Sequence, residues 1–258
     1  MSQKKPVALW AVPRSISTAF ERVFVERDDF EVLHEPFSAS YYYSEDRLSD
    51  RYSEVEPDPH YNYEHVLKEI LKPHKKRLFV KDMPHHARDL LSPHFAANFV
   101  NTFIVRDPKY VIASLNKMWP DFILEETGFE HLYELFRYAT EVNGQEAVVV
   151  DAMSFSENPG GILGAYCERV GVPFEPRSLR WESREVEGWE MWDEWHGEAQ
   201  QSTTIRRAER KDPTLSRDLQ QVYDHCLPYY YKLAAHAIPG TARGKHPVRR
   251  AGAHPGRR

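Results

Sequence analysis

Residues 7–27 read VALWAVPRSISTAFERVFVER, and this stretch decides the fold. The apolar run Pro6–Val12 predicts a strand that is buried on both faces. A helical pattern follows over Thr18–Arg27, with Glu21 at the spacing of a capping box. The loop Pro13–Thr18 between them carries one arginine and three hydroxyl side chains. A loop that leads into a helix gathers unpaired N–H groups and the positive end of the helix dipole, so we expect this loop to bind an anion.

The rest of the chain repeats this alternation of strand and helix. Four further apolar or β-branched runs predict strands, at Phe30–His34, Lys76–Lys81, Phe99–Val105 and Ala147–Asp151. Helical patterns separate them, at Tyr61–Leu71, Pro84–Leu91, Pro108–Met118, Thr127–Asn143, Gly160–Val170 and Leu215–Ala237. Such alternation is typical of an α/β fold, a mostly parallel sheet flanked by helices. Ligands bind such sheets beyond the carboxyl ends of the strands, so the residues that follow each strand are the candidates for a site.

Length and charge narrow the class of protein. The chain has 258 residues, 34 Lys and Arg against 39 Asp and Glu, and a net charge of −5. We expect one domain over 1–238 and a basic, disordered tail over 239–258 that is rich in Gly, Pro and Arg. Because the tail holds basic residues and no acids, the remaining body is more acidic than the whole, which argues against a nucleic-acid partner.

The chain shows no sign of a membrane or secretory address. No apolar run approaches the roughly 18–20 residues that span a bilayer, and the N-terminus lacks a signal-peptide pattern. The two cysteines, Cys167 and Cys226, form neither a disulfide framework nor a metal knuckle. We therefore expect a cytoplasmic protein without a membrane partner, and homodimer formation stays open.

A second anion-binding pattern follows the fourth predicted strand. Arg106 stands at the strand end, Pro108 suits the first turn of the next helix, and Ser114 lies near its second turn on a face that can point back to Arg106. An arginine can fork onto a phosphate while a hydroxyl adds one more donor. The alternative is that Arg106 pairs with its neighbour Asp107.

These two motifs, P-R-S-I-S-T at Pro13–Thr18 and R-D-P-x5-S from Arg106 to Ser114, resemble those of sulfotransferases that use 3′-phosphoadenosine-5′-phosphosulfate (PAPS). The resemblance covers roughly residues 7–175 and implies the P-loop NTPase-like sulfotransferase fold. It also implies which residues hold the cofactor: Arg14, Ser15, Ile16, Ser17 and Thr18 for the 5′-phosphosulfate, and Arg106 with Ser114 for the 3′-phosphate. Ile16 replaces the family's usual glycine. Because a β-branched residue resists positive φ, we expect ordinary backbone angles there.

The same resemblance suggests the catalytic residues. Glu35, after the second strand, matches the general base of several branches of the family, and strand alternation would then direct His34 elsewhere. Lys81 matches the lysine that stabilises the leaving group, and Arg14 would share that task. Cytosolic members place a base histidine two residues after this lysine. Here that position is Met83, which favours Glu35 as the base.

Aromatic residues suggest where an acceptor binds. Tyr41–Tyr43 follow Glu35, and four tryptophans lie late in the chain, at Trp181, Trp189, Trp192 and Trp195. They can wall an acceptor cleft or pack as core and lid anchors, and both interpretations stay open. Family members often close the nucleotide site with a basic loop from this region, so the resemblance implies that Arg206 or Arg207 helps to hold the 3′-phosphate. His85 and His86 lack metal-site spacing, so we expect structural or solvent-facing roles for them and no metal.

The leading hypothesis is a PAPS-dependent sulfotransferase that transfers a sulfuryl group in line to the hydroxyl or amine of a small-molecule acceptor and releases 3′,5′-bisphosphoadenosine (PAP). The acidic body favours a small or cationic acceptor over a polyanionic glycan. One alternative is an ATP-dependent small-molecule kinase, against which the missing Walker G-x-x-x-x-G-K pattern counts. The other alternative is a non-catalytic protein that binds a 3′,5′-bisphosphonucleotide.

Overall fold

A computed structural model describes residues 4–208 and 212–240. Its centre is a five-stranded sheet, formed by β1 (Val7–Ala11), β2 (Phe30–His34), β3 (Arg77–Asp82), β4 (Val100–Val105) and β5 (Val149–Asp151). The order is β2-β3-β1-β4-β5 and every pairing is parallel. All five predicted strands are confirmed. The predicted basic tail lies outside the described residues from position 241 onward.

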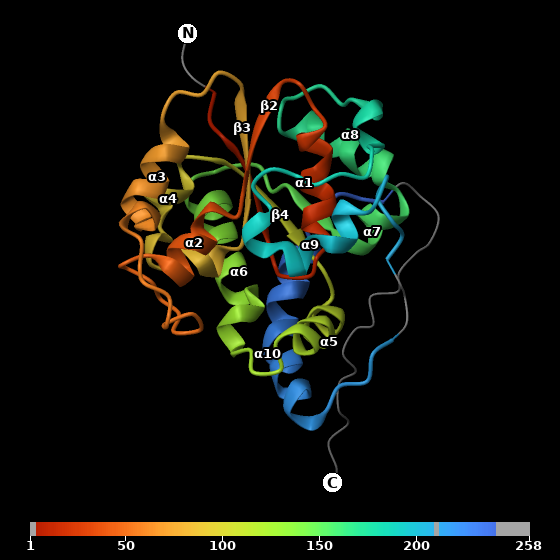
Figure 1. Cartoon of the computed structure of the whole chain (residues 1–258). Coiled ribbons are helices and arrows are strands. Elements are labelled where there is room, and N and C mark those ends of the chain that lie inside the picture. The colour runs from red at the N-terminus through yellow and green to blue at the C-terminus, as the bar shows by residue number, and fades with distance from the viewer. Residues whose placement is uncertain (1–3, 209–211, 241–258) are drawn as a thin grey trace.

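Helices cover both faces of this sheet (Figure 1). One face carries α1 (Ser17–Val25), α7 (Ala152–Glu157) and α8 (Pro159–Arg169). The other face carries α2 (Pro36–Tyr43), α3 (Tyr63–Leu71), α4 (Pro93–Ala96), α5 (Pro108–Met118), α6 (Phe129–Arg137) and α10 (Arg217–Ala234), while α9 (Asp193–Gln200) lies near α1. Short 3-10 turns occupy Pro59–Tyr61, Pro84–Leu90, Leu124–Thr127, Pro176–Leu179 and Glu190–Trp192, and a π turn occupies Tyr138–Val142. The predicted α/β fold, a parallel sheet flanked by helices, is confirmed.

The position of β1 at the centre of the sheet explains why its sequence is apolar throughout. Ala8 and Trp10 pack into the core beneath α2, α3 and α4, and Val7 and Leu9 pack into the core beneath α1 and α8. All four side chains are fully buried. A strand enclosed on both faces has no solvent side on which a polar residue would be favourable.

The start of α1 differs from the predicted one. The helix begins at Ser17, its N-cap residue is Ile16, and no side chain of the described residues caps it. The buried Glu21 carboxylate contacts His34 and Trp189, and no capping box is formed, so the predicted capping box is wrong. Ile16 has φ 66° and ψ 15°, which is the left-handed region, so the prediction of ordinary backbone angles is also wrong. The sharp turn from strand to helix imposes these angles, and packing of the Ile16 side chain against the core on the α1 face offsets their cost.

Other helices differ in type or were not predicted. Pro84–Leu90 is a 3-10 turn, and the predicted helix over Thr127–Asn143 is interrupted at Gly128, which has φ 73°. The sequence analysis did not predict α2, because its residues PFSASYYY show no helical period of apolar and polar side chains.

The strand order brings the candidate residues together. The strands β2 and β3 lie on one side of β1, and β4 and β5 lie on its other side. After β3 the chain therefore crosses β1, and the next strands are added on the opposite side of the sheet. In parallel sheets this reversal opens a crevice beyond the carboxyl ends of the strands. The loops that follow β1, β2, β3 and β4 all meet there.

Candidate active site

A cleft of about 1000 Å³ lies at the carboxyl ends of the strands. Its lining includes every residue that the sequence analysis assigned to catalysis or to the 5′-phosphosulfate and 3′-phosphate motifs, namely Arg14, Ser15, Ile16, Ser17, Thr18, Glu35, Lys81, Arg106 and Ser114. These residues come from four separate segments of the chain. The structure thus brings them into one site, and their individual roles stay predictions.

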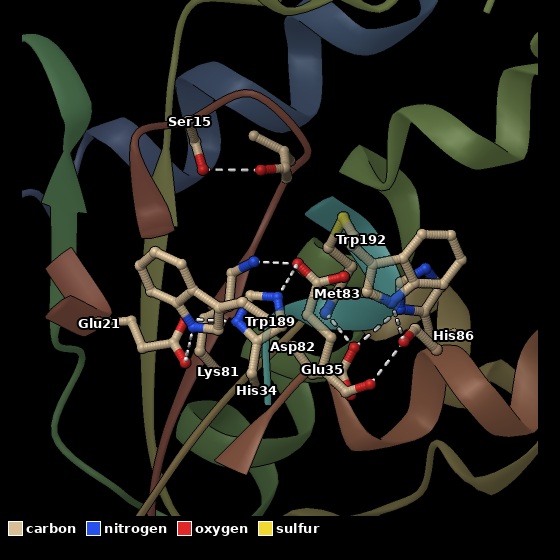
Figure 2. Close-up of polar contacts among 12 residues, drawn as sticks. Ser15, Glu21, His34, Glu35, Lys81, Asp82, Met83, His86, Trp189 and Trp192 are labelled. Atoms are coloured by element: carbon tan, nitrogen blue, oxygen red, sulfur yellow. Dashed lines mark hydrogen bonds and ion pairs between the residues drawn. The ribbon is translucent and has the colours of Figure 1, made fainter. Parts of the chain in front are cut away.

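The loop before α1 forms the floor of one half of the cleft. Both Arg14, with φ 57°, and Ile16 have left-handed backbone angles, and together they turn the chain tightly from β1 into α1. Among the described residues no side chain caps α1, and the positive end of its dipole lies at the cleft, where it favours an anion. The hydroxyl of Ser15 donates to the carbonyl of Val12 at 2.6 Å and so closes the loop (Figure 2).

Two arginines and one serine form the rest of this half. The Nε of Arg14 donates to the hydroxyl of Ser114 at 3.0 Å, and a guanidinium nitrogen of Arg106 donates to the carbonyl of Arg14 at 2.9 Å. Ser114 therefore contacts Arg14, where the sequence analysis expected Arg106. The alternative pairing of Arg106 with Asp107 is not what these contacts show, since the Asp107 carboxylate caps α5 by accepting from the N–H of Lys109 at 2.8 Å.

Arg106 lies in a setting that favours an anionic ligand. Burial, and then the positive charge of Arg14, lower the pKa of the Arg106 guanidinium from its ordinary value. Its Nε is buried and has no hydrogen-bond partner among residues 4–208 and 212–240. A phosphate at this position would both satisfy the Nε donor and neutralise the two neighbouring positive charges.

The other chemical centre of the cleft is a buried ion pair. The ammonium of Lys81, from β3, contacts Oε1 of Glu35, and both side chains are almost fully buried. Glu35 follows β2 with φ 44° and ψ 49°, and its N–H donates to the carbonyl of Lys81 at 2.7 Å. A left-handed backbone at a non-glycine residue is costly and persists only where its surroundings hold it. This conformation directs the carboxylate of Glu35 into the cleft beside Lys81.

A second carboxylate and a histidine lie behind this pair, and the sequence analysis missed their connection. The Nδ1 of His34 is 2.7 Å from Oε2 of Glu21, and its Nε2 is 3.7 Å from Oε1 of Glu35 (Figure 2). Trp189 donates from its indole Nε1 to Oε1 of Glu21 at 3.4 Å. His34 does not line the cleft, in keeping with strand alternation, but its ring lies against Glu35 because Glu35 has left the strand. The spacing of Glu21 could have indicated that it is buried. It falls on the i, i+3, i+4, i+7 stripe of buried positions 17, 20, 21 and 24 of α1.

The other half of the cleft is walled mainly by aromatic side chains. Tyr42, Trp119, Trp192 and Trp195 line it together with Met83, His85 and His86. The rings of Tyr42 and Trp192 lie 5.4 Å apart between centroids, so the two aromatic groups that are far apart in the sequence do meet. Arg206 and Arg207 line the cleft as well.

His85 and His86 are both buried, so the prediction of a solvent-facing role is wrong and the structural alternative remains. The Nδ1 of His86 is 2.8 Å from Oδ1 of Asp82. Burial is the main cause that holds the pKa of His85 well below its ordinary value, so this ring is neutral. Within the described part of the chain, no group of three or more His, Cys, Asp and Glu side chains is placed to hold a metal ion.

Comparison with known proteins identifies the family. The sequence model of a family described as "Sulfotransferase domain" matches residues 5–237. The chain belongs to the sulfotransferase family. In the described ranges, no helix has both the length and the apolar character that a bilayer crossing requires.

Individual relatives are distant. Two Arabidopsis thaliana proteins called branched-chain-amino-acid aminotransferase-like protein 2 and protein 1 are 27% and 24% identical over 88% and 92% of this chain. The match covers 41% and 43% of those two proteins, so this chain spans less than half of their length, and their name is not carried over to it. Among solved structures, the sulfotransferase domain of the Synechococcus PCC 7002 olefin synthase is 14% identical, with a TM-score of 0.49 over 87% of this chain and 95% of that one.

Proposed function

We propose that this protein transfers the sulfuryl group of PAPS to a hydroxyl or amine of a small-molecule acceptor and releases PAP. The observation that carries the proposal is the division of one cleft into two parts. One part gathers Arg14, Arg106 and the uncapped start of α1, and the other places the buried Glu35–Lys81 pair beside an aromatic wall.

The first part suits a doubly anionic nucleotide. Arg106 has a buried Nε that lacks a partner among the described residues, and Arg14 holds Ser114 close beside it. PAPS carries one anionic group at its 3′ position and another at its 5′ position. We assign the 3′-phosphate to Arg106 and Ser114 and the 5′-phosphosulfate to Arg14 and the N–H groups at the start of α1, with Ser17 and Thr18 as hydroxyl donors. PAPS, when bound, supplies the sulfuryl group.

The ion pair suits the chemistry of transfer. Glu35 accepts the proton of the attacking hydroxyl or amine on its carboxylate. Lys81 lies on the same carboxylate before reaction, so it can move by a short side-chain rotation to the developing negative charge on the leaving phosphate. Arg14 adds a second positive charge at that place. Positioning and charge stabilisation then account for most of the catalysis, as in phosphoryl transfer.

The aromatic wall suits a small acceptor that presents an apolar face. Tyr42, Trp119 and Trp192 supply flat surfaces, and neutral His85 adds no charge. Such a surface binds apolar bodies and leaves few groups to pair with a polyanion.

Two measurements test the proposal. Calorimetric titration with PAP, with ATP and Mg²⁺ as the control, should give micromolar binding of PAP and much weaker binding of ATP. The purified protein should then transfer radiolabelled sulfuryl from PAPS to at least one member of a panel of phenols, alcohols and amines. Tighter binding of ATP would favour a kinase. Binding of PAP with no transfer to any acceptor would favour a non-catalytic nucleotide-binding protein.

A further inference from the structure

The feature that the proposed function leaves unused is the buried chain of groups behind Glu35. Four ionisable side chains from three segments touch in sequence: Glu21 on α1, His34 and Glu35 at the end of β2, and Lys81 on β3. Figure 2 shows them in a line that ends at the Glu35–Lys81 contact. None of the four has more than a few per cent of its side chain exposed.

A purely structural explanation of this chain is unfavourable. Glu21 is fully buried on the apolar face of α1, where an ionised carboxylate costs free energy unless it is paired. An apolar side chain at this position would continue the stripe formed by Phe20 and Phe24 at no such cost. Clusters of buried, mutually paired ionisable groups beside a cleft are more typical of a functional site.

The geometry gives His34 a defined orientation. Its Nδ1 lies 2.7 Å from Oε2 of Glu21, and because an ionised carboxylate only accepts hydrogen bonds, Nδ1 is the donor in this contact. When the ring carries one proton, at Nδ1, its Nε2 has the lone pair that can accept a second proton, and Nε2 faces Oε1 of Glu35. The distance of 3.7 Å is longer than a hydrogen bond, and the same Oε1 already contacts Lys81.

We propose that Glu21 and His34 are positioning residues: Glu21 orients the ring of His34, and His34 takes over the proton that Glu35 removes from the acceptor. The proposal rests on the proposed function, in which Lys81 leaves Glu35 for the leaving group. With Lys81 gone, Glu35 can close the gap to Nε2 of His34.

The proton and electron balance is simple. The acceptor O–H or N–H bond breaks and its proton passes to Glu35, while the acceptor atom bonds to sulfur. The bond between sulfur and the bridging oxygen breaks, and its electron pair stays on the 5′-phosphate of PAP. Glu35 passes the proton to Nε2 of His34, and the resulting imidazolium lies between the carboxylates of Glu21 and Glu35. Glu35 returns to its ionised form, and the proton leaves by the reverse path when products leave.

The test is His34→Asn, because the asparagine amide can still donate to Glu21 from the place of Nδ1 but has no group at the place of Nε2. With the panel acceptor that wild type sulfates fastest, we expect kcat to fall at least about tenfold, within the range that proton transfer contributes to catalysis. The KM for PAPS and the calorimetric affinity for PAP should stay within about twofold, since His34 does not line the cleft.

A matched control is His74→Asn. The side chain of His74 is also mostly buried, and its Nδ1 also pairs with a glutamate, Glu31, at 3.2 Å, but it does not line the cleft and does not contact Glu35. This variant should keep the kcat of wild type. A fall in kcat that is equal in both variants, or a loss of PAP affinity in His34→Asn, would overturn the relay in favour of general destabilisation.

A spectroscopic measurement is independent of turnover. Protein labelled with ¹⁵N-histidine and saturated with PAP should show His34, assigned by its loss in His34→Asn, protonated at Nδ1 and bare at Nε2. A proton on Nε2 would overturn the relay. The two proposals fail differently: a wild type that transfers nothing from PAPS refutes the proposed function and the relay with it. An active wild type whose kcat is unchanged by His34→Asn refutes the relay alone.

Discussion

Replacement of Ile16 by glycine and by alanine tests whether the loop before α1 is strained. Ile16 has φ 66° and ψ 15°, and its side chain packs against the core on the α1 face. Both substitutions remove nearly all of that packing, so it cancels when the two variants are compared with each other. What remains is the cost of a left-handed backbone, which alanine carries and glycine does not.

The sign of the comparison is the informative result. A left-handed residue with a Cβ costs roughly 1–2 kcal/mol, whereas glycine loses about 0.5–1 kcal/mol relative to alanine through the greater freedom of the unfolded chain. Ile16→Gly should therefore unfold with a free energy about 0.5–1 kcal/mol higher than Ile16→Ala. At an ordinary helical or extended position the order is reversed, and alanine is the more stable variant.

Urea unfolding followed by circular dichroism measures this difference, provided that both variants show equal m-values. Thermal unfolding should agree, with a midpoint about 1–4 °C higher for Ile16→Gly. Equal stability of the two variants, or a more stable Ile16→Ala, would show that position 16 has an ordinary backbone conformation and that the loop before α1 is not strained there.

Three further predictions concern the cleft. Arg106→Ala should weaken PAP binding by about 10–100-fold in calorimetry, since a charged hydrogen bond contributes about 1.5–3 kcal/mol. Glu35→Gln should lower kcat by about 10²–10⁴-fold and leave PAP affinity nearly intact, because the base is removed and the anion half is not. His85 has a pKa below its ordinary value in the folded state, so protons bind the unfolded chain preferentially. The free energy of unfolding is therefore not reduced by His85 above about pH 6.5, and below that pH it falls by about 1.4 kcal/mol per pH unit as the unfolded chain takes up the proton. His85→Gln should therefore lose less stability than wild type between pH 7 and pH 5.5 in urea unfolding.

The first two of these predictions have a control on the same chain. Arg137→Ala removes an exposed arginine of α6 that pairs with Glu141 outside the cleft, and PAP affinity should not change. Glu31→Gln removes a half-exposed carboxylate of β2 and should keep the kcat of wild type. Unchanged PAP affinity in Arg106→Ala would remove Arg106 from the nucleotide site. A parallel pH dependence in wild type and His85→Gln would show that His85 is not held neutral by burial.

The sheet and its cleft were predictable because their signals are local. The apolar runs at Val7–Ala11 and Val100–Val105 mark strands buried on both faces, and the parallel sheet then requires that the loops after them share one edge. The polar residues that follow these strands, Arg14 and Arg106, were therefore expected in one place, and they line one cleft.

The details within the cleft depend on contacts between distant residues, and no local pattern encodes them. Ser114 bonds to Arg14, which lies 100 positions away, and Lys81 pairs with Glu35 across 46 positions. The left-handed angles at Ile16 and Glu35 oppose the intrinsic preference of those residue types, so tertiary packing must impose them. Glu21 had the spacing of a helix cap, but its burial opposite His34 decides its contacts.

The strand order also has a consequence for how the chain folds. The strand β1 lies between β3 and β4, so its two hydrogen-bonding partners begin at Arg77 and Val100, far along the chain. During synthesis at about 5–20 residues per second, the segment VALWA waits for several seconds before either edge can pair. Long-range parallel pairing is also slow to form once the strands are available. The most apolar strand of the sheet is thus the one that stays unpaired longest, and nascent chains of this protein should be most prone to aggregate, and most in need of a chaperone, before β4 has been made.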